Sequence, residues 1–136
     1  MKIIIDMNIV FSSLLKKESK IRNKLFEKEL EIFAPNFLFI EFIKNINRII
    51  SYSELKEDEL IIMLEELFEH INFVPDKAIS KENKVIAYQL FKDVDVKDTP
   101  YIALALELNC LLWTGDKKLK QGLFKKNINI FYEINQ

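Results

Sequence analysis

Two kinds of apolar pattern alternate along this chain. Short continuous runs rich in β-branched or aromatic residues occur at 1–5, 31–34, 111–113 and 129–132. Runs of this length predict strands that are buried on both faces, as in a parallel sheet. Phe73 and Val74 form a still shorter run, which predicts a strand or a loop before Pro75. Because helix-spaced patterns separate these runs, the sequence predicts an α/β fold, a central parallel sheet flanked by helices on both faces.

Capping residues and helical spacing define the expected helices. These cover residues 9–15, 19–28, 36–50, 54–71, 80–93 and 98–108, and a further helix follows Asp116. The side chains expected to face the core are Phe39, Phe42 or Ile43, Ile46 and Ile50 in helix 36–50, Leu60, Leu64, Leu67 and Ile71 in helix 54–71, and Ala87, Leu90, Phe91 and Val94 near helix 80–93. Asn109 tolerates the left-handed conformation that ends many helices.

Both long helices carry more apolar residues than one buried face can hold. The additional residues are Phe37, Leu38 and Ile40 in helix 36–50, and Ile61, Ile62 and Met63 in helix 54–71. A helix in a small domain packs one face inward, so another element of the chain or a partner must cover the rest. Both explanations stay open, and the second predicts a homodimer formed through one or both helices.

Composition excludes several classes of protein. The 136 residues are expected to form a single domain, residues 1–136, and 49% of them are apolar. No apolar run is long enough to span a bilayer, and Asp6 interrupts the first one, so neither a membrane span nor a secretory signal is predicted. The net charge of −1 excludes nucleic-acid binding through bulk positive charge. The single cysteine, Cys110, forbids an internal disulfide and suits a cytoplasmic location.

Acidic residues stand where predicted strands and helices meet. Asp6 follows the first strand directly, Asp98 opens a helix with Pro100 in its first turn, and Asp116 follows strand 111–113 across a Thr-Gly turn. Helices that start after parallel strands gather at the carboxyl edge of the sheet. If the first strand lies beside strand 111–113, Asp6 and Asp116 end neighbouring strands. The sequence therefore places three carboxylates at one edge.

Each acid also has a purely structural explanation. Asp98 and Asp116 can act as ordinary helix N-caps, which are worth roughly 1 kcal/mol each. Glu41, isolated among apolar residues, can pair on the surface with Lys44 or Arg48. Carboxylates that converge repel one another and raise one another's pKa values, so a cluster of them indicates a neutralising cation. Oxygen donors without His or Cys suit Mg²⁺ or Mn²⁺.

Four motifs together resemble the PIN-domain nucleases, and among them most of all the VapC-type toxins of toxin–antitoxin pairs. They are IIIDMNIV near the start, a lone glutamate in the helix after the second strand, DVKDTPYIALAL at 95–106 and WTGDKKL at 113–119. The last two are the most specific, and the resemblance runs from Met1 to the last strand. Met7 departs from the family pattern, in which Thr or Ser is usual.

The resemblance implies a central parallel sheet and an endoribonuclease that depends on Mg²⁺ or Mn²⁺. The family's acidic residues carry over to Asp6, Glu41, Asp98 and Asp116, and of these Asp6, Asp98 and Asp116 would hold one or two ions. Asn8 and Thr114 would orient carboxylates or water, and Asp95 would support the site or cap a helix. Under this hypothesis Arg48, Lys97, Lys117 and Lys118 would bind RNA phosphates. The resemblance also implies a small antitoxin protein as partner and favours the homodimer.

Two other classes of protein fit part of the pattern. A Mg²⁺-dependent phosphotransfer domain also places Asp at strand ends. However, haloacid-dehalogenase-like phosphatases need a second Asp where this chain has Asn8, and the paired acids of a receiver domain have no match after the first strand. A non-catalytic RNA- or protein-binding module has no need of all four acids. A Mn²⁺-dependent RNA cleavage assay distinguishes these hypotheses.

Overall fold

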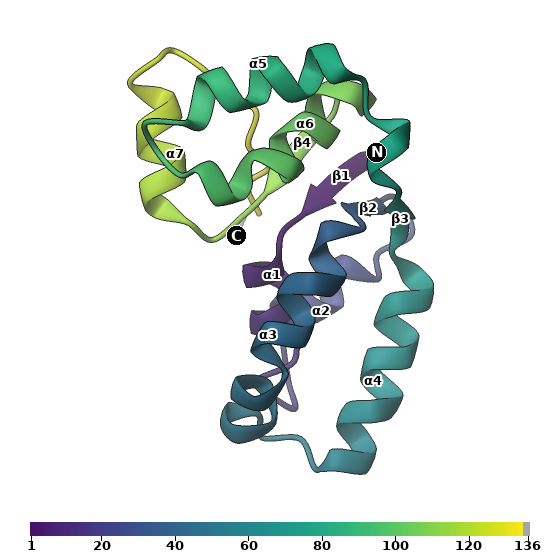
Figure 1. Ribbon diagram of the computed structural model, residues 1–136. Coiled ribbons are helices and arrows are strands. Elements are labelled where there is room, and N and C mark those ends of the chain that lie inside the picture. The colour runs from purple at the N-terminus through teal and green to yellow at the C-terminus, as the bar shows by residue number, and fades with distance from the viewer. Residues whose placement is uncertain (135–136) are drawn as a thin grey trace.

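A computed structural model describes residues 1–134 as an α/β fold built on a four-stranded parallel sheet (Figure 1). The strands are β1 (Lys2–Ile5), β2 (Glu31–Pro35), β3 (Asn72–Val74) and β4 (Leu111–Trp113), in the spatial order β3-β2-β1-β4. The helices are α1 (Met7–Ser13), α2 (Lys20–Leu25), α3 (Phe37–Tyr52), α4 (Glu57–His70), α5 (Lys81–Phe91), α6 (Thr99–Leu108) and α7 (Lys117–Phe124). Two 3₁₀ turns, η1 (Asp76–Ala78) and η2 (Val96–Asp98), precede α5 and α6. The predicted fold class is confirmed.

The strand order places helices on both faces of the sheet. Strands β1, β2 and β3 are added in one direction, and the chain then returns past β1 to form β4. Because crossovers between parallel strands are right-handed, α1 to α4 lie on one face and α5 and α6 lie on the other. Helix α6 contacts β1, β2 and β4 and is backed by α5, while α3 contacts β2 (Figure 1). This double covering explains why Ile3, Ile4 and Ile5 are all fully buried.

Local sequence accounts for the termini of several helices. Ser19 and Ser80 accept backbone N–H bonds at the starts of α2 and α5, as their positions predicted. Asn109 ends α6 with a φ of 50°, in the left-handed region. Helix α2 ends at Leu25 rather than near Lys28, because the chain must turn toward β2.

The predicted core stripe of α3 is wrong except at Phe42. Leu38, Phe42 and Ile49 are the buried side chains, whereas Ile43 is 69% exposed. Phe39, Ile46 and Ile50 of the predicted stripe are also exposed. The buried face of α3 includes the polar Asn45 between Phe42 and Ile49, so its helical spacing of apolar residues is interrupted. The amide of Asn45 is satisfied because it donates to the backbone carbonyl of Glu41 at 2.7 Å.

The other predicted apolar patterns agree better with the structure. Leu60, Leu67 and Ile71 are buried, and Ala87 and Phe91 bury one side of α5. The predicted strand 129–132 is reduced to a single parallel bridge between Leu112 and Phe131. Strand β4 has only three residues, and Leu112 is its central one. The backbone N–H of Leu112 donates to the carbonyl of Ile130 at 2.7 Å, and its carbonyl accepts from the N–H of Tyr132 at 2.8 Å.

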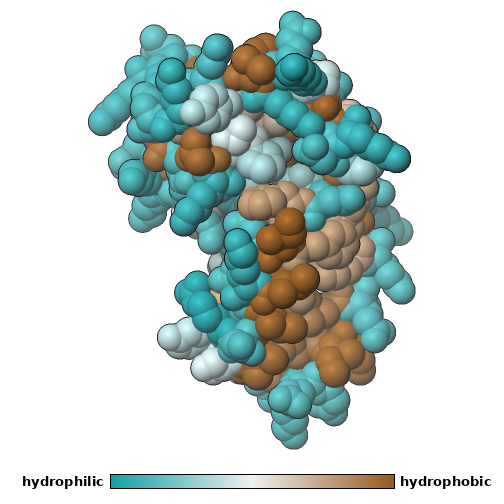
Figure 2. Space-filling model, viewed as in Figure 1, coloured by the Kyte–Doolittle hydropathy of each residue, from teal (hydrophilic) through white to brown (hydrophobic). Residues whose placement is uncertain are grey.

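An apolar surface runs along the outside of the α3–α4 pair (Figure 2). We call Ile43, Ile46, Ile50, Ile61 and Ile62 the apolar face; all five are exposed. A groove of about 260 Å³ lies between the two helices and is lined partly by the same residues. Of the residues expected to be in excess, Leu38 belongs to the core instead. Within residues 1–134, no helix is both long enough and apolar enough to cross a membrane.

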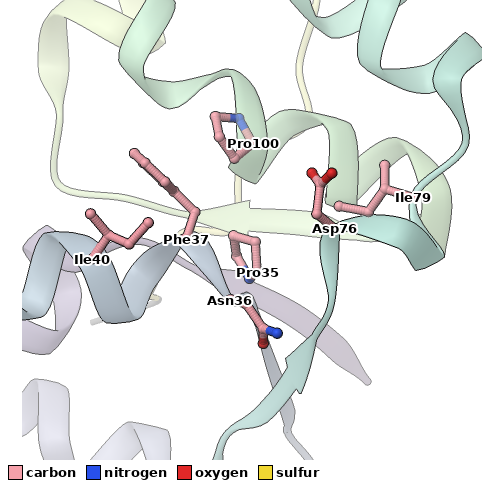
Figure 3. Close-up of a pocket in the computed structure, with 7 residues that line it drawn as sticks. All are labelled: Pro35, Asn36, Phe37, Ile40, Asp76, Ile79 and Pro100. Atoms are coloured by element: carbon pink, nitrogen blue, oxygen red, sulfur yellow. The ribbon is translucent and has the colours of Figure 1, made fainter.

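A separate pocket of about 320 Å³ borders the carboxyl ends of β2 and β3 (Figure 3). Phe37 and Ile40 of α3 form one side, and Asp76 and Ile79 form the opposite side. Pro35, at the end of β2, and Pro100, in the first turn of α6, also line it. The pocket therefore opens at the same edge of the sheet as Asp6 and Asp116, which follow β1 and β4.

Candidate metal centre

Strands β1 and β4 end side by side and bring Asp6 close to Asp116. Ile5 pairs with Trp113 in the sheet register, so Asp6 and Thr114 are the next residue on each strand. Thr114 donates its hydroxyl to Asp6 Oδ2 and accepts the backbone N–H of Asp116 at 3.1 Å. Thr114 is buried, and its hydroxyl bridges the two acids.

Both strand-end acids also cap helices. Asp6 Oδ1 accepts the backbone N–H of Ile9 at 3.1 Å, at the start of α1. Asp116 Oδ1 accepts the backbone N–H of Leu119 at 3.0 Å, at the start of α7. The N-cap expected at Asp116 is therefore confirmed, and Asp6 caps α1 in the same way. Capping does not exclude another role, because the helix uses only one oxygen of each carboxylate.

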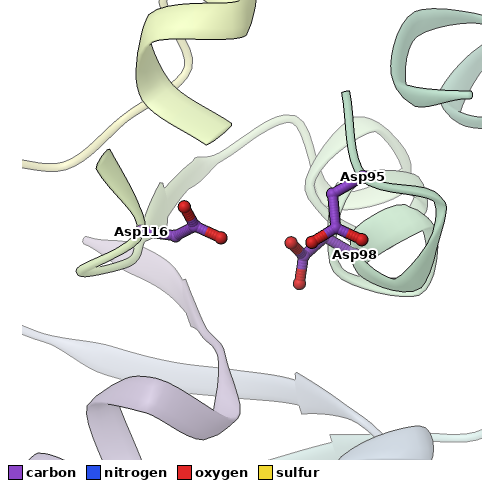
Figure 4. Close-up of side chains that lie close together, drawn as sticks. All are labelled: Asp95, Asp98 and Asp116. Carbon is purple, nitrogen blue, oxygen red and sulfur yellow. The ribbon is translucent and has the colours of Figure 1, made fainter. Parts of the chain in front are cut away.

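Asp98 differs from the other two acids. It occupies the N-cap position of α6 but makes no capping bond with its side chain. The preceding turn brings in Asp95, whose Oδ1 accepts the backbone N–H of Lys97 at 3.0 Å. One carboxylate oxygen from each of Asp95, Asp98 and Asp116 lies within 4.8 Å of the others, and their side chains converge (Figure 4). We call these three residues the acidic triad.

The electrostatics of the site show crowding of negative charge. Burial, followed by the charges of Asp95, Asp6, Asp116 and Glu41, raises the pKa of Asp98 to about 8. Burial also raises the pKa of Asp6 to about 6, although its bonds from Thr114 and Ile9 act in the opposite direction. Burial and the converging carboxylates therefore shift Asp98 and Asp6 toward the protonated form.

Glu41 joins this group from α3. Its carboxylate accepts a hydrogen bond from the hydroxyl of Tyr101 on α6. No ion pair joins it to Lys44 or Arg48 among the described residues, so the surface-pair explanation does not hold. Burial raises the pKa of Glu41, and the Tyr101 bond opposes that rise. We call Asp6, Glu41, Asp95, Asp98 and Asp116 the acid cluster.

Tyr101 is a site residue that the sequence analysis missed. Its side chain is 1% exposed, and it packs edge-on against Phe37 with ring centroids 6.3 Å apart. Burial, followed by the Glu41 bond, raises its pKa far above the ordinary value. The available signal was a tyrosine inside the apolar segment 101–105, because a buried tyrosine hydroxyl requires a hydrogen-bond partner.

The basic residues and Asn8 are more scattered than the acids. Lys97 lies close enough to Glu41 to lower its pKa, and Lys117 and Lys118 follow Asp116 in the first turn of α7. All three lysines and Asn8 are exposed. Arg48 is placed differently: its guanidinium lies 5.0 Å from the centre of the Phe11 ring and donates to Asn45 at 3.2 Å.

The donor set fits a hard divalent cation. The acidic triad offers only carboxylate oxygens, and Asp98 has no helix-capping bond to compete for them. Mg²⁺ and Mn²⁺ prefer such ligands, and either would offset both the burial and the repulsion that raise the pKa of Asp98. Asp6 lies beside the triad, and its two oxygens accept hydrogen bonds from Ile9 and Thr114.

The fold and this site define a class of protein: a parallel α/β domain with clustered carboxylates at the carboxyl edge of its sheet. A family model described as the PIN domain matches residues 4–130, and the chain belongs to the PIN-domain family. PIN domains are usually metal-dependent nucleases. No functionally curated protein matches the chain. The resemblance seen in the sequence motifs is therefore confirmed at the level of the family.

Proposed function

We propose that this protein is an endoribonuclease that hydrolyses RNA phosphodiester bonds with Mg²⁺ or Mn²⁺, and that residues 1–136 act as a single domain. The observation that carries the proposal is the acidic triad, whose carboxylate oxygens lie within 4.8 Å of one another in a PIN-family chain. Such crowding of partly buried carboxylates is unfavourable without a cation, because burial and mutual repulsion both oppose their charged forms. It becomes favourable when a divalent ion is shared.

The members of the acid cluster have distinct proposed roles. Asp98 and Asp116 hold one or two ions together with Asp6, and Asp95 supplies a further oxygen from η2. Glu41 completes the catalytic set from α3, directly or through water. When bound, a divalent cation lowers the pKa of water and stabilises negative charge on the scissile phosphate. Thr114 keeps the carboxylate of Asp6 in place, and Asn8 stays a candidate for orienting water.

Phosphate binding depends on local charge in this proposal. The net charge of −1 gives the protein no overall attraction for RNA. Lys97, Lys117 and Lys118 are exposed and would supply positive charge locally, beside the acid cluster. Arg48 is the weakest of the four candidates, because it lies two helical turns along α3 from Glu41 and packs on Phe11.

The decisive test is an RNA cleavage assay with a metal-free preparation. We expect single-stranded RNA to be cut when millimolar Mn²⁺ or Mg²⁺ is added, and cutting to stop with excess EDTA. Formation of a covalent adduct with beryllofluoride, in the absence of RNA cleavage, would instead support a phosphotransfer domain. RNA binding without cleavage at any metal concentration would support a non-catalytic module.

Tyr101→Phe should lower RNA cleavage by roughly 10- to 100-fold, the usual effect of losing a group that orients a site residue. The reason is that Tyr101 donates to Glu41, whose carboxylate is otherwise repelled by Asp95. The measurement is a double-mutant cycle in which Tyr101→Phe is also made in a Glu41→Gln background. If Tyr101 acts through Glu41, the second Tyr101→Phe change has little further effect; an equal loss in both backgrounds would contradict this role.

We also propose that the chain is the toxin of a toxin–antitoxin pair that acts in the cytoplasm. The proposal rests on the resemblance of the motifs to VapC-type toxins, and a single cysteine is consistent with a reducing compartment. Expression should arrest bacterial growth, and Asp116→Asn should relieve the arrest. Coexpression of a small protein encoded beside this gene should also relieve it; growth unaffected by the active enzyme would contradict the toxin role.

The protein is further proposed to form a homodimer through the apolar face. Ile43, Ile61 and Ile62 are each more than half exposed, and a closed two-fold contact would bury them against their copies. Sedimentation equilibrium at micromolar concentration should give a dimer mass, and Ile61→Glu should give a monomer. Val85→Glu, on the exposed side of α5, is the matched control and should leave the dimer intact. A monomer mass for the unaltered protein would refute self-association.

A further inference from the structure

The pocket bordered by α3, η1 and the start of α6 has a defined relation to the acid cluster. Pro35 ends β2, and Asp76 and Ile79 follow β3, so the pocket lies over the carboxyl ends of these two strands. The acid cluster lies over the ends of β1 and β4. Ligands of open parallel sheets bind outside this edge. A chain-like ligand bound at the acids can therefore extend along the edge into the pocket.

The two sites meet at the first turn of α6. Asp98 belongs to the acidic triad, and Pro100, two residues later, lines the pocket. A second connection runs through side chains. Phe37 lines the pocket and packs against Tyr101, which in turn donates a hydrogen bond to Glu41. Only one side chain thus separates the aromatic wall of the pocket from a carboxylate of the acid cluster.

The walls of the pocket determine what it can accept. Phe37, which is half-buried, offers an aromatic ring, and Pro35, Ile40, Ile79 and Pro100 offer apolar surface (Figure 3). Asp76 is the charged residue among those that line it, and its carboxylate already pairs with Lys84 at 2.7 Å. An anionic phosphate is disfavoured beside apolar walls and a carboxylate. A flat, uncharged and polarizable group suits these walls.

We propose that this pocket receives one unpaired nucleobase of the RNA substrate, beside the phosphodiester that the acid cluster cleaves. The inference rests on the proposed ribonuclease function and deepens it, because it assigns a base-binding site to an enzyme whose other contacts are to phosphate. Bases of single-stranded RNA turn outward and stack on aromatic side chains. Stacking of one base on one ring is strong enough to affect substrate affinity measurably.

Phe37→Leu tests the proposal because it removes the aromatic face and keeps an apolar side chain. We expect KM for single-stranded RNA to rise about tenfold or more, with little change in kcat. Ile40→Ala is the second variant; Ile40 is 50% exposed, so folding is not at risk, and loss of this wall should raise KM in the same direction. Val85→Ala, at an exposed apolar position on α5, should leave KM unchanged.

A substrate without a base separates base binding from damage to the catalytic site. Mn²⁺-dependent hydrolysis of an oligonucleotide in which every sugar is abasic should proceed equally in the unaltered protein, Phe37→Leu and Ile40→Ala. In RNA oligonucleotides that carry a single abasic sugar, one position near the cut should raise KM for the unaltered protein. At that position Phe37→Leu should cause no further loss.

The outcomes distinguish this inference from the function on which it rests. If the unaltered protein cleaves neither RNA nor the base-free phosphodiester, the proposed ribonuclease function fails. If it cleaves RNA and both pocket variants keep an unaltered KM, the base pocket is refuted and the ribonuclease stands. A loss of base-free hydrolysis in Phe37→Leu that Ile40→Ala does not share would show that Phe37 acts only by supporting Tyr101 and Glu41, which also refutes the pocket.

Discussion

Asp98→Asn and Asp116→Asn are each expected to lower Mn²⁺-dependent RNA cleavage by at least about 100-fold. Changes to groups that merely support metal ligands cost 10- to 100-fold, so loss of a ligand should cost at least as much. Both residues belong to the acidic triad, where their oxygens converge with that of Asp95. Asp6→Asn is expected to have a similar effect, because Asp6 lies beside the triad and is held by Thr114. Initial rates with a labelled RNA oligonucleotide provide the measurement.

Folding must be shown to be intact in these variants. Asparagine keeps a side-chain oxygen that can accept the capping bond from Leu119 in α7, so Asp116→Asn should retain its cap. Asp58→Asn, an exposed acid on α4, is the matched control and should cleave RNA like the unaltered protein. Full activity in purified and folded Asp98→Asn or Asp116→Asn would remove the basis for the proposed metal site.

Asp98→Asn is expected to stabilise the metal-free protein at alkaline pH. The pKa of Asp98 is raised to about 8 in the folded protein from an ordinary value of 3.8, so folding favours its protonated form. Stability from this group is therefore fully present below about pH 4 and is lost as the pH rises to about 8. The melting temperature of Asp98→Asn should exceed that of the unaltered protein by about 5 °C at pH 8. The difference should shrink steadily as the pH falls toward 4.

Added Mn²⁺ should reverse this order. A ligand that binds only the folded state at a hundredfold excess over its Kd stabilises it by about 2.7 kcal/mol, and the unaltered protein should gain this while Asp98→Asn should not. Asp93→Asn is a control whose effect on the melting temperature at pH 8 should have the opposite sign, because the Lys126 pair lowers the pKa of Asp93. A melting temperature that does not respond to millimolar Mn²⁺ in the unaltered protein would indicate an acid cluster with no cation site.

The fold class and the edge at which the acids gather could be predicted from the amino-acid sequence alone. Alternating strand and helix patterns required a parallel sheet, and Asp6, Asp98 and Asp116 stood one residue after a strand or at the start of a helix. These are local properties: side-chain branching, capping and turn chemistry act within a few residues. For the same reason the left-handed Asn109 and the cap at Asp116 were predictable.

Which acids lie closest together, and which side of α3 is buried, depend instead on the packing of distant elements. Asp95 joins Asp98 and Asp116 because turn η2 folds it back, whereas Asp6 is held by Thr114. Apolar residues occupy two sides of α3, so periodicity did not reveal that Leu38 rather than Ile43 faces the sheet. Tyr101 meets Glu41 across 60 residues of sequence, and Phe37 faces Ile79 across the pocket. Contacts of this kind depend on how distant elements pack, which no local pattern encodes.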